Sequence, residues 1–260
     1  MGLTEFDGDL TACAALVERA DPHRFRAVMA APLAARPTLF ALYAFNVEVS
    51  RAPWVTGEAL IAEMRLQWWH DALEEIASGG NVRRHEVVTP LAAVLDPAAA
   101  ELLTGLVSAR RADIEAAPFD DTEALLAYLD ATSGHLLWAA AGALGATAAS
   151  EATVRDAALA LGLANWLRAI PALEAAGKQP LPDGRPEAVA DLARLGLARL
   201  AQARKARAGV PVAAMLPLAG VRAALAQAAR RPGDVGASRL PTEGLRISAA
   251  MGWAAATGRW

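Results

Sequence analysis

Apolar residues recur at the three- and four-residue spacing of an α-helix along almost the whole chain, and no segment shows a convincing β-strand alternation. Alanine, which has the best helix propensity, is abundant, whereas the β-branched residues that favour strands are sparse. Because 55% of the 260 residues are apolar, the chain can bury a large core. The sequence therefore predicts an all-α protein, with one domain spanning residues 1–260.

Glycine, proline and aspartate divide this periodic pattern into helices. Breaks are expected at residues 78–81, 177–185 and 231–233, which are rich in glycine or proline. Asp96 and Asp121 are expected to begin helices, since an aspartate side chain accepts hydrogen bonds from free amide groups there. The predicted helices span residues 9–19, 23–31, 35–52, 57–78, 86–95, 97–116, 121–147, 151–170, 186–207, 212–230 and 241–256.

Charge and cysteine content narrow the possible functions. The formal net charge is −3 without a block of like charges, which argues against a nucleic-acid partner. Cys13 is the one cysteine, which excludes an intrachain disulfide and a zinc site built from several cysteines. The acidic N-terminus lacks the features of a signal peptide, so we expect a cytoplasmic location. The uncharged run 131–150 is mostly small residues and favours a buried core helix over a membrane span.

The most informative stretch is residues 165–182, which read NWLRAIPALEAAGKQPLP. It resembles the second aspartate-rich motif of squalene and phytoene synthases, roughly N-I-L-R-D-x-x-x-D-x-x-x-G-R-x-Y-L-P. The matching residues are Asn165, Leu167, Arg168, Gly177, Leu181 and Pro182. At the two positions where that family carries magnesium-binding aspartates, this chain has Ala169 and Leu173.

A second stretch resembles the first motif of the same family, roughly Y-A-F-C-R-x-x-D-D-x-x-D. Residues 42–46, Leu-Tyr-Ala-Phe-Asn, match its opening. The aspartate positions then fall on Ser50, Arg51 and Trp54. Both motifs thus keep their surroundings and lose their acids, and further matches follow in order along nearly the whole chain.

The resemblance implies the isoprenoid-synthase type of helical bundle around a central cavity. In that family, magnesium ions held by carboxylates bind the diphosphate of an isoprenoid substrate. Magnesium prefers octahedral oxygen coordination, and two acids four residues apart lie on one face of a helix. Ala169, Leu173 and Trp54 offer no oxygen ligand, and Ser50 offers a neutral one. We therefore predict no metal site and no catalytic residue at these positions.

Two prolines lie between the former metal positions. Pro53 follows Ser50 and Arg51, and Pro171 lies between Ala169 and Leu173. A proline inside a helix removes a hydrogen bond and clashes with the preceding turn, at a cost of about 3 kcal/mol. Both helices are therefore expected to end or kink at these prolines.

Some polar residues of a diphosphate pocket remain. Tyr43, Asn165 and Arg168 match family positions that contact the diphosphate or its metal. Two residual acids remain: Glu48 lies inside the first remnant motif, and Asp113 matches a further acid that recurs in the family. A second interpretation is structural: Tyr43 and Asn165 are satisfied inside a helical core, and Arg168 caps a helix end. The sequence leaves both open.

Residues 42–46 followed by the acid Glu48, and then Gln67-Trp68-Trp69, resemble a degenerate branch of the family more than its working synthases. That branch includes the phytoene-synthase-like assembly factor of mitochondrial respiratory complex I. The resemblance therefore implies a catalytically inactive scaffold or assembly factor that has no cofactor. Its expected partner is a protein, and the resemblance suggests a subunit of a respiratory complex. Peripheral contact with the inner membrane is compatible with this role. Two alternatives stay open. One is a prenyl transferase that condenses two isoprenoid diphosphates at a rebuilt magnesium site. The other is a binder of an isoprenoid or lipid in the cavity.

Two further features have simpler interpretations. His70 and Glu74 have the one-turn spacing of metal ligands on a helix, but a solvated helix face is the more common reason for such a pair. The uncharged run 208–221 contains Pro211 and Pro217 and is suited to a core segment, a pocket wall, a membrane contact or a partner surface.

Overall fold

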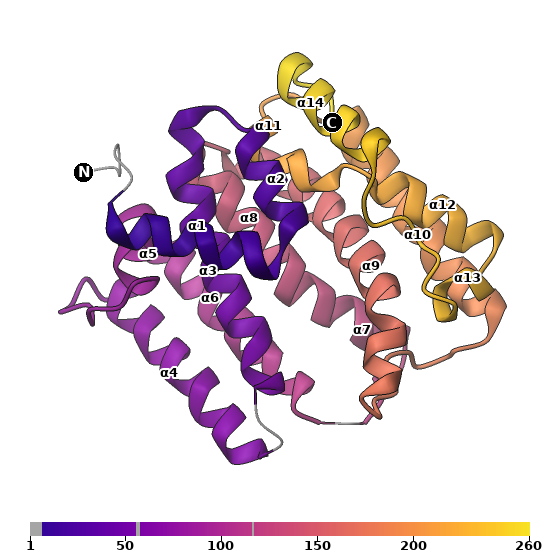
Figure 1. The fold of residues 1–260 in the computed structure, drawn as a ribbon, viewed down its shortest axis with the longest axis horizontal. Helices are drawn as coiled ribbons and strands as arrows, with labels where there is room; N and C mark the ends of the chain where they lie inside the picture. Colours follow the sequence, from indigo (N-terminus) through magenta and orange to yellow (C-terminus); the bar gives the residue numbers. More distant parts are fainter. Residues whose placement is uncertain (1–6, 56–57, 116) are drawn as a thin grey trace.

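The computed structural model describes residues 7–55, 58–115 and 117–260, and the described part contains helices and no strand (Figure 1). The all-α prediction is therefore confirmed. The α-helices are α1 (Gly8–Ala20), α2 (Pro22–Ala30), α3 (Arg36–Arg51), α4 (Ala59–Ala77), α5 (Val88–Val94), α6 (Pro97–Ala109), α7 (Thr122–Leu129), α8 (His135–Ala143), α9 (Glu151–Ala175), α10 (Pro186–Lys205), α11 (Val212–Met215), α12 (Val221–Arg230), α13 (Gly233–Gly236) and α14 (Leu245–Thr257).

The helices pack in one bundle around α3 and α9. Helix α3 packs against α1, α5 and α8, and its aromatic residues Phe40, Tyr43 and Phe45 are fully buried. Helix α9 packs against α8 on one side and α10 on the other, with α12 beyond (Figure 1). Because α3 and α9 carry the two remnant motifs, this arrangement decides what the motifs can face.

Aspartate caps begin several helices, as the sequence predicts. The side chains of Asp96 and Asp121 accept hydrogen bonds from the amides of Ala99 and Ala124 at 2.7 and 2.8 Å. Each such cap contributes roughly 1 kcal/mol to helix stability. The glycine- and proline-rich stretches at 78–81 and 177–185 lie between helices, which confirms those breaks.

Two predicted helices are interrupted. The segment predicted as one helix over 121–147 is α7, a π-helical turn (Asp130–Gly134) and α8. The segment predicted over 212–230 is α11, a 3-10 turn (Leu216–Leu218) and α12. Pro217 lies inside that turn and Gly220 has a φ of 84°, which ends a helix at little steric cost.

The two prolines have different effects. Helix α3 ends at Arg51, and Pro53 lies in a 3-10 turn (Ala52–Trp54), as predicted. The prediction that the second helix ends near Pro171 is wrong, since α9 continues through it to Ala175. Leu167 and Ile170 are buried against neighbouring elements on this helix. Tertiary packing supplies most helix stability in proteins, and here it offsets the hydrogen bond that the proline removes.

By length and composition alone, one stretch of the described residues, Val212–Arg230, is long and apolar enough to cross a membrane. Its most apolar part is 56% buried inside the bundle, and Pro217 and Gly220 interrupt it. These are features of a core segment, so the stretch is weak support for a membrane span.

Candidate functional site

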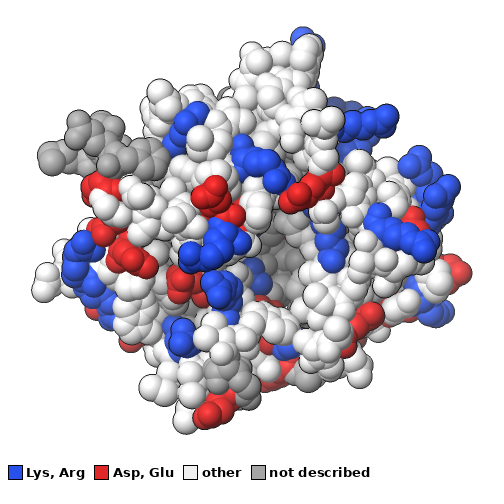
Figure 2. Space-filling model, in the orientation of Figure 1, with Lys and Arg blue, Asp and Glu red and all other residues white. Residues whose placement is uncertain are grey.

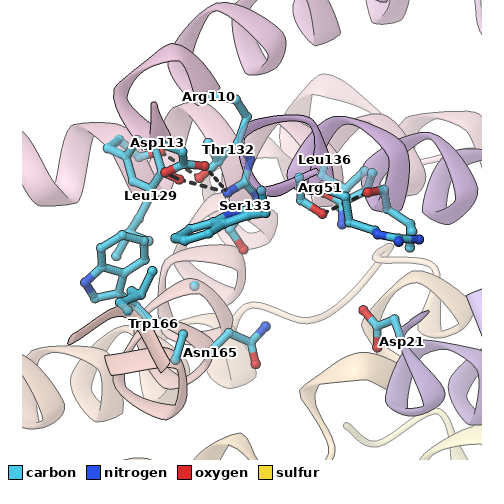
Figure 3. Close-up of a pocket in the computed structure, with 18 of the residues that line it drawn as sticks. Asp21, Arg51, Arg110, Asp113, Leu129, Thr132, Ser133, Leu136, Asn165 and Trp166 are labelled. Atoms are coloured by element: carbon cyan, nitrogen blue, oxygen red, sulfur yellow. Dashed lines mark hydrogen bonds and ion pairs between the residues drawn. The ribbon is translucent and has the colours of Figure 1, made fainter. Parts of the chain in front are cut away.

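A cavity of about 490 Å³ lies between α3 and α9, within the size range of small-molecule sites. The end of α1, the start of α2, the turn after α6, the end of α7, the π-helical turn and the start of α8 complete its wall. Figure 2 shows a hollow near the centre of this face, with basic and acidic side chains around it. Figure 3 shows the polar side chains that line the cavity.

The four former metal positions all face this cavity. Ser50 and Trp54 reach it from the end of α3 and the turn that follows, and Ala169 and Leu173 reach it from α9. Since α9 is continuous, Ala169 and Leu173 lie one turn apart on the same face. The two positions of the second motif therefore keep the orientation that metal ligands would need, but their side chains have no oxygen donors.

Of the three residues predicted for a remnant diphosphate pocket, Asn165 and Arg168 remain neighbours on α9, but only Asn165 lines this cavity. Tyr43 and Arg168 are absent from its lining. Arg168 donates hydrogen bonds to the carbonyl oxygen of Pro241 at 3.0 and 2.8 Å and to Oδ1 of Asn165 at 3.0 Å. Burial lowers the pKa of Arg168. Its guanidinium thus ties α9 to the segment before α14.

Tyr43 lies in the core. The residue is 1% exposed, and its hydroxyl has no hydrogen-bond partner among the described residues. Burial raises the pKa of Tyr43 to about 12, and the Arg24 guanidinium lies 5.3 Å from its ring centroid. Glu48 is half-buried and does not line the cavity. Neither residue contributes to the cavity surface.

Asp113, the other residual acid, does line the cavity, but it is engaged in a hydrogen-bonded triad (Figure 3). Arg110 Nη1 lies 3.0 Å from its Oδ2, and the Tyr128 hydroxyl donates to its Oδ1 at 2.7 Å. Arg110 also donates to the Tyr128 oxygen at 2.8 Å. Burial raises the pKa of Tyr128, so this hydroxyl stays a donor.

Asp21 is the second acid in the lining, and it too has a structural role. Its carboxylate caps α2 by accepting from the amide of Arg24 at 2.9 Å, and it pairs with the Arg24 guanidinium at 2.6 Å. Burial opposes ionisation, but the charge and hydrogen bonds of Arg24 outweigh it and lower the pKa of Asp21. With Arg51 at the rim, the cavity faces three arginines and two aspartates.

The π-helical turn shapes one wall. It places Thr132 and Ser133 at the cavity, and the Thr132 hydroxyl donates to the carbonyl oxygen of Tyr128 at 2.7 Å. Gly162 of α9 allows the close approach, because a Cβ there would lie 3.0 Å from the Cβ of Ser133. Single π turns of this kind occur often at functional sites.

Lys178 joins two edges of the site. Its ammonium lies 4.9 Å from the ring centroid of Trp54 and donates to the carbonyl oxygens of Asp113 and Glu115, the latter at 2.8 Å. Trp166, whose Nε1 donates to the carbonyl oxygen of Pro180 at 2.9 Å, covers the adjoining wall. The loop after α9 is therefore held against the segment after α6.

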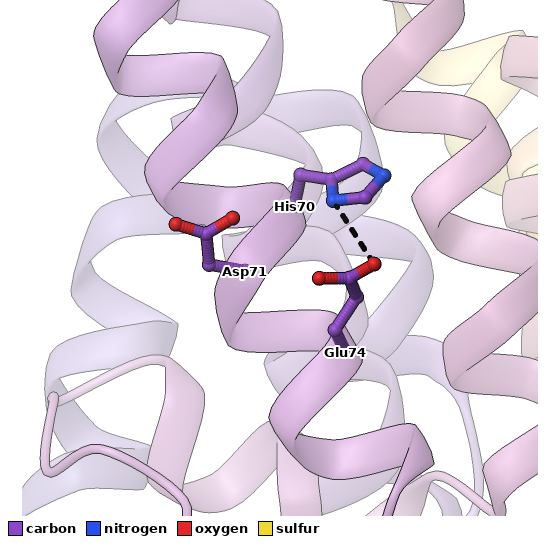
Figure 4. A group of neighbouring side chains, drawn as sticks. All are labelled: His70, Asp71 and Glu74. Atoms are coloured by element: carbon purple, nitrogen blue, oxygen red, sulfur yellow. Dashed lines mark ion pairs between the residues drawn. The ribbon is translucent and has the colours of Figure 1, made fainter.

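The His70 and Glu74 pair lies on α4 (Figure 4), and neither residue lines the cavity. His70 Nδ1 is 3.8 Å from Glu74 Oε1, and with Asp71 the three residues can bring ligand atoms within 4.8 Å of one another. Asp71 already accepts a hydrogen bond from Gln67 at 2.7 Å, and Glu74 is exposed. This arrangement matches the interpretation as a solvated helix face.

Several lining residues were not identified from the sequence: Asp21, Arg24, Arg110, Tyr128, Thr132 and Ser133. Asp21 precedes Pro22, which signals a helix start but not a pocket. Arg110 and Tyr128 meet only because η3 (Arg110–Asp113) folds back against α7. No local pattern carries that information.

Solved structures share the fold. A dehydrosqualene synthase crystallised with a ligand has a TM-score of 0.78 at 12% identity, covering 96% of both chains. The squalene synthase HpnC from Alicyclobacillus acidocaldarius has a TM-score of 0.68 at 19% identity, covering 87% of this chain and 94% of its own. The predicted isoprenoid-synthase type of fold is confirmed.

Sequence comparison agrees with the fold. A Drosophila melanogaster protein described as a homolog of NADH dehydrogenase (ubiquinone) complex I assembly factor 6 is 44% identical over 66 residues. The alignment spans 24% of this chain and 19% of that relative. The family model for squalene/phytoene synthase matches residues 17–230. The chain therefore belongs to the squalene/phytoene synthase family.

Proposed function

We propose that this protein is a non-catalytic member of its family that acts as a scaffold in the assembly of a respiratory membrane complex. The non-catalytic part of the proposal rests on which side chains face the cavity at the former metal positions. Ser50, Trp54, Ala169 and Leu173 face it without a carboxylate.

The remaining acids cannot easily replace the lost ligands. Asp21 and Asp113 are each paired with an arginine, at 2.6 and 3.0 Å. Recruiting either for magnesium would break a partly buried ion pair and leave the arginine beside a divalent cation, which Coulomb repulsion opposes. The lining therefore favours anions and disfavours the metal cluster that ionises a prenyl diphosphate.

The second half of the proposal rests on the Drosophila relative, whose description names complex I assembly. Because the matched segment is short, the partner is itself part of the proposal. We place the protein at the inner face of a respiratory membrane, in contact with a subunit of the assembling complex.

Catalysis is tested by incubating the purified protein with farnesyl or geranylgeranyl diphosphate and magnesium, followed by lipid extraction. We expect no condensed product. A squalene-like or phytoene-like product would overturn the non-catalytic proposal in favour of a prenyl transferase with a rebuilt metal site. A working squalene synthase in the same buffer is the positive control.

The assembly role is tested by co-purification from native membranes under mild detergent. Recovery of respiratory-complex subunits is the expected result. Their absence, while an active respiratory complex is present in the same membranes, would contradict the assembly role without affecting the non-catalytic proposal.

A second candidate function is binding of an isoprenoid or lipid in the cavity. It is favoured by the roughly 490 Å³ volume and by the apolar Leu129, Leu136 and Leu173 in its wall. Native mass spectrometry of the freshly purified protein should then show a retained lipid. A spectrum of the apo mass alone, with Leu136→Trp and wild type indistinguishable, would argue against it.

A further inference from the structure

A groove of about 550 Å³ lies between α12, α14 and the segment that joins α11 to α12, and it shares no lining residue with the central cavity. Four arginines line it, and no aspartate or glutamate does. We call it the arginine groove, defined by Arg204, Arg222, Arg246 and Arg259.

These arginines lack acidic partners. None of the four forms an ion pair with a carboxylate in the described part of the chain, whereas eleven other arginines do. Arg204 is half-buried, and its Nε has no hydrogen-bond partner among the described residues. Burial, and then the nearby positive charges of Arg222 and Arg207, lower the pKa of Arg204. An anion in the groove would relieve this repulsion.

The groove also has an apolar side. Met215, Leu216 and Leu218 are buried at its floor. On α14, Arg246, Ala250 and Trp253 follow one another at four- and three-residue spacing, so they share one helix face. Trp253 is 62% exposed although it is a large aromatic side chain. Basic and apolar groups therefore lie on one surface.

We propose that the arginine groove docks the protein on a membrane by binding the phosphate of an anionic phospholipid, with Trp253 inserted at the headgroup level. Arginine matches phosphate geometry with paired donors, and tryptophan prefers the interface between lipid and water. The exposed tryptophan beside the arginines favours a lipid over an acidic peptide, which would need no interfacial aromatic. The proposal does not depend on the assembly role, because lipid binding by the groove requires neither a protein partner nor an inactive cavity.

The first test measures sedimentation with vesicles of phosphatidylcholine alone or mixed with phosphatidylglycerol. Wild type should bind the mixed vesicles only. Each basic residue near an anionic surface contributes about a five-fold factor, so the R222Q/R246Q variant should bind about 25-fold more weakly. The control is R230Q/R231Q, which removes the same charge from exposed positions on and beside α12 outside the groove.

Three results would overturn the proposal: no binding of wild type to the mixed vesicles, equal weakening by both double variants, or full competition by inorganic phosphate at low concentration. The last would assign the groove to free phosphate. Binding of an acidic peptide with vesicle binding absent would assign it to a protein partner instead.

The second test locates the contact. Lipids with a bromine-labelled acyl chain quench nearby tryptophan fluorescence. Wild type should be quenched on binding, and Trp253→Phe should bind similarly but lose most of the quenching. Unchanged quenching in Trp253→Phe would show that another surface meets the membrane.

Discussion

The hydroxyl of Tyr128 donates a hydrogen bond to Asp113 over 2.7 Å, although Asp113 lies in η3 and Tyr128 in α7. Together with Arg110 they form a closed polar triad in the cavity wall. The carboxylate of Asp113 is therefore already occupied by hydrogen bonds within the cavity wall.

Replacing Asp113 by alanine should destabilise the protein. The change leaves the Arg110 guanidinium largely buried without its counter-charge, and breaking such a pair costs about 3 kcal/mol. Urea unfolding measures the change in free energy. Tyr128→Phe removes one hydrogen bond and should cost about 1 kcal/mol. Equal, small effects from both variants would show that the triad is unimportant for stability.

Returning acids to α9 should create a metal site without changing the fold. In the A169D/L173D variant, two carboxylates lie one turn apart and face the cavity. Magnesium should then raise the melting temperature, because a ligand at ten times its Kd stabilises by about 1.4 kcal/mol. Wild type and the neutral A169N/L173N variant should not respond. A magnesium response in wild type would instead reveal a native site.

Gly220 should be intolerant of substitution. Its φ is 84°, where a residue with a Cβ is disfavoured, and a Cβ would lie 2.8 Å from the end of the Ile247 side chain. Gly220→Ala should therefore lower stability by about 1–2 kcal/mol. Gly252→Ala is the control, since Gly252 is inside α14 with open space around it. Alanine there should be neutral or stabilising by up to about 1 kcal/mol.

Stability should fall in mild acid because of two half-buried histidines, His23 and His135. Burial lowers the pKa of both His23 and His135 below the ordinary value of 6.5. The unfolded chain therefore binds protons first as the pH drops through about 6.5, which favours unfolding until the folded-state pKa is passed. Each histidine contributes a slope of at most about 1.4 kcal/mol per pH unit.

His23→Gln should flatten this dependence. A glutamine amide can still donate to the carbonyl oxygen of Pro217, which His23 Nε2 contacts at 2.9 Å, but it does not titrate. Urea unfolding measured from about pH 7 to pH 5 gives the slope. An identical slope in wild type and H23Q would exclude His23 as a contributor.

The comparison of sequence with structure shows where local information ends. The break at 78–81, the caps at Asp96 and Asp121 and the end of α3 before Pro53 depend on groups a few residues apart, and all were predictable. The passage of α9 through Pro171 was not, because packing against distant helices offsets a local cost. The lining role of Arg110 and Tyr128 likewise depends on residues 18 apart in the chain.

The amino-acid sequence alone determined the helical class, the family resemblance and the absence of acids at the four former metal positions. These properties reside in residue types and short spacings. Only the tertiary structure decided that Arg168 donates hydrogen bonds to the carbonyl oxygen of Pro241, 73 residues away. It also decided that arginines from three helices lie beside Trp253 with no acidic residue in the same groove. Such outcomes depend on how helices pack, which is a balance of burial over the whole chain rather than a property of any one segment.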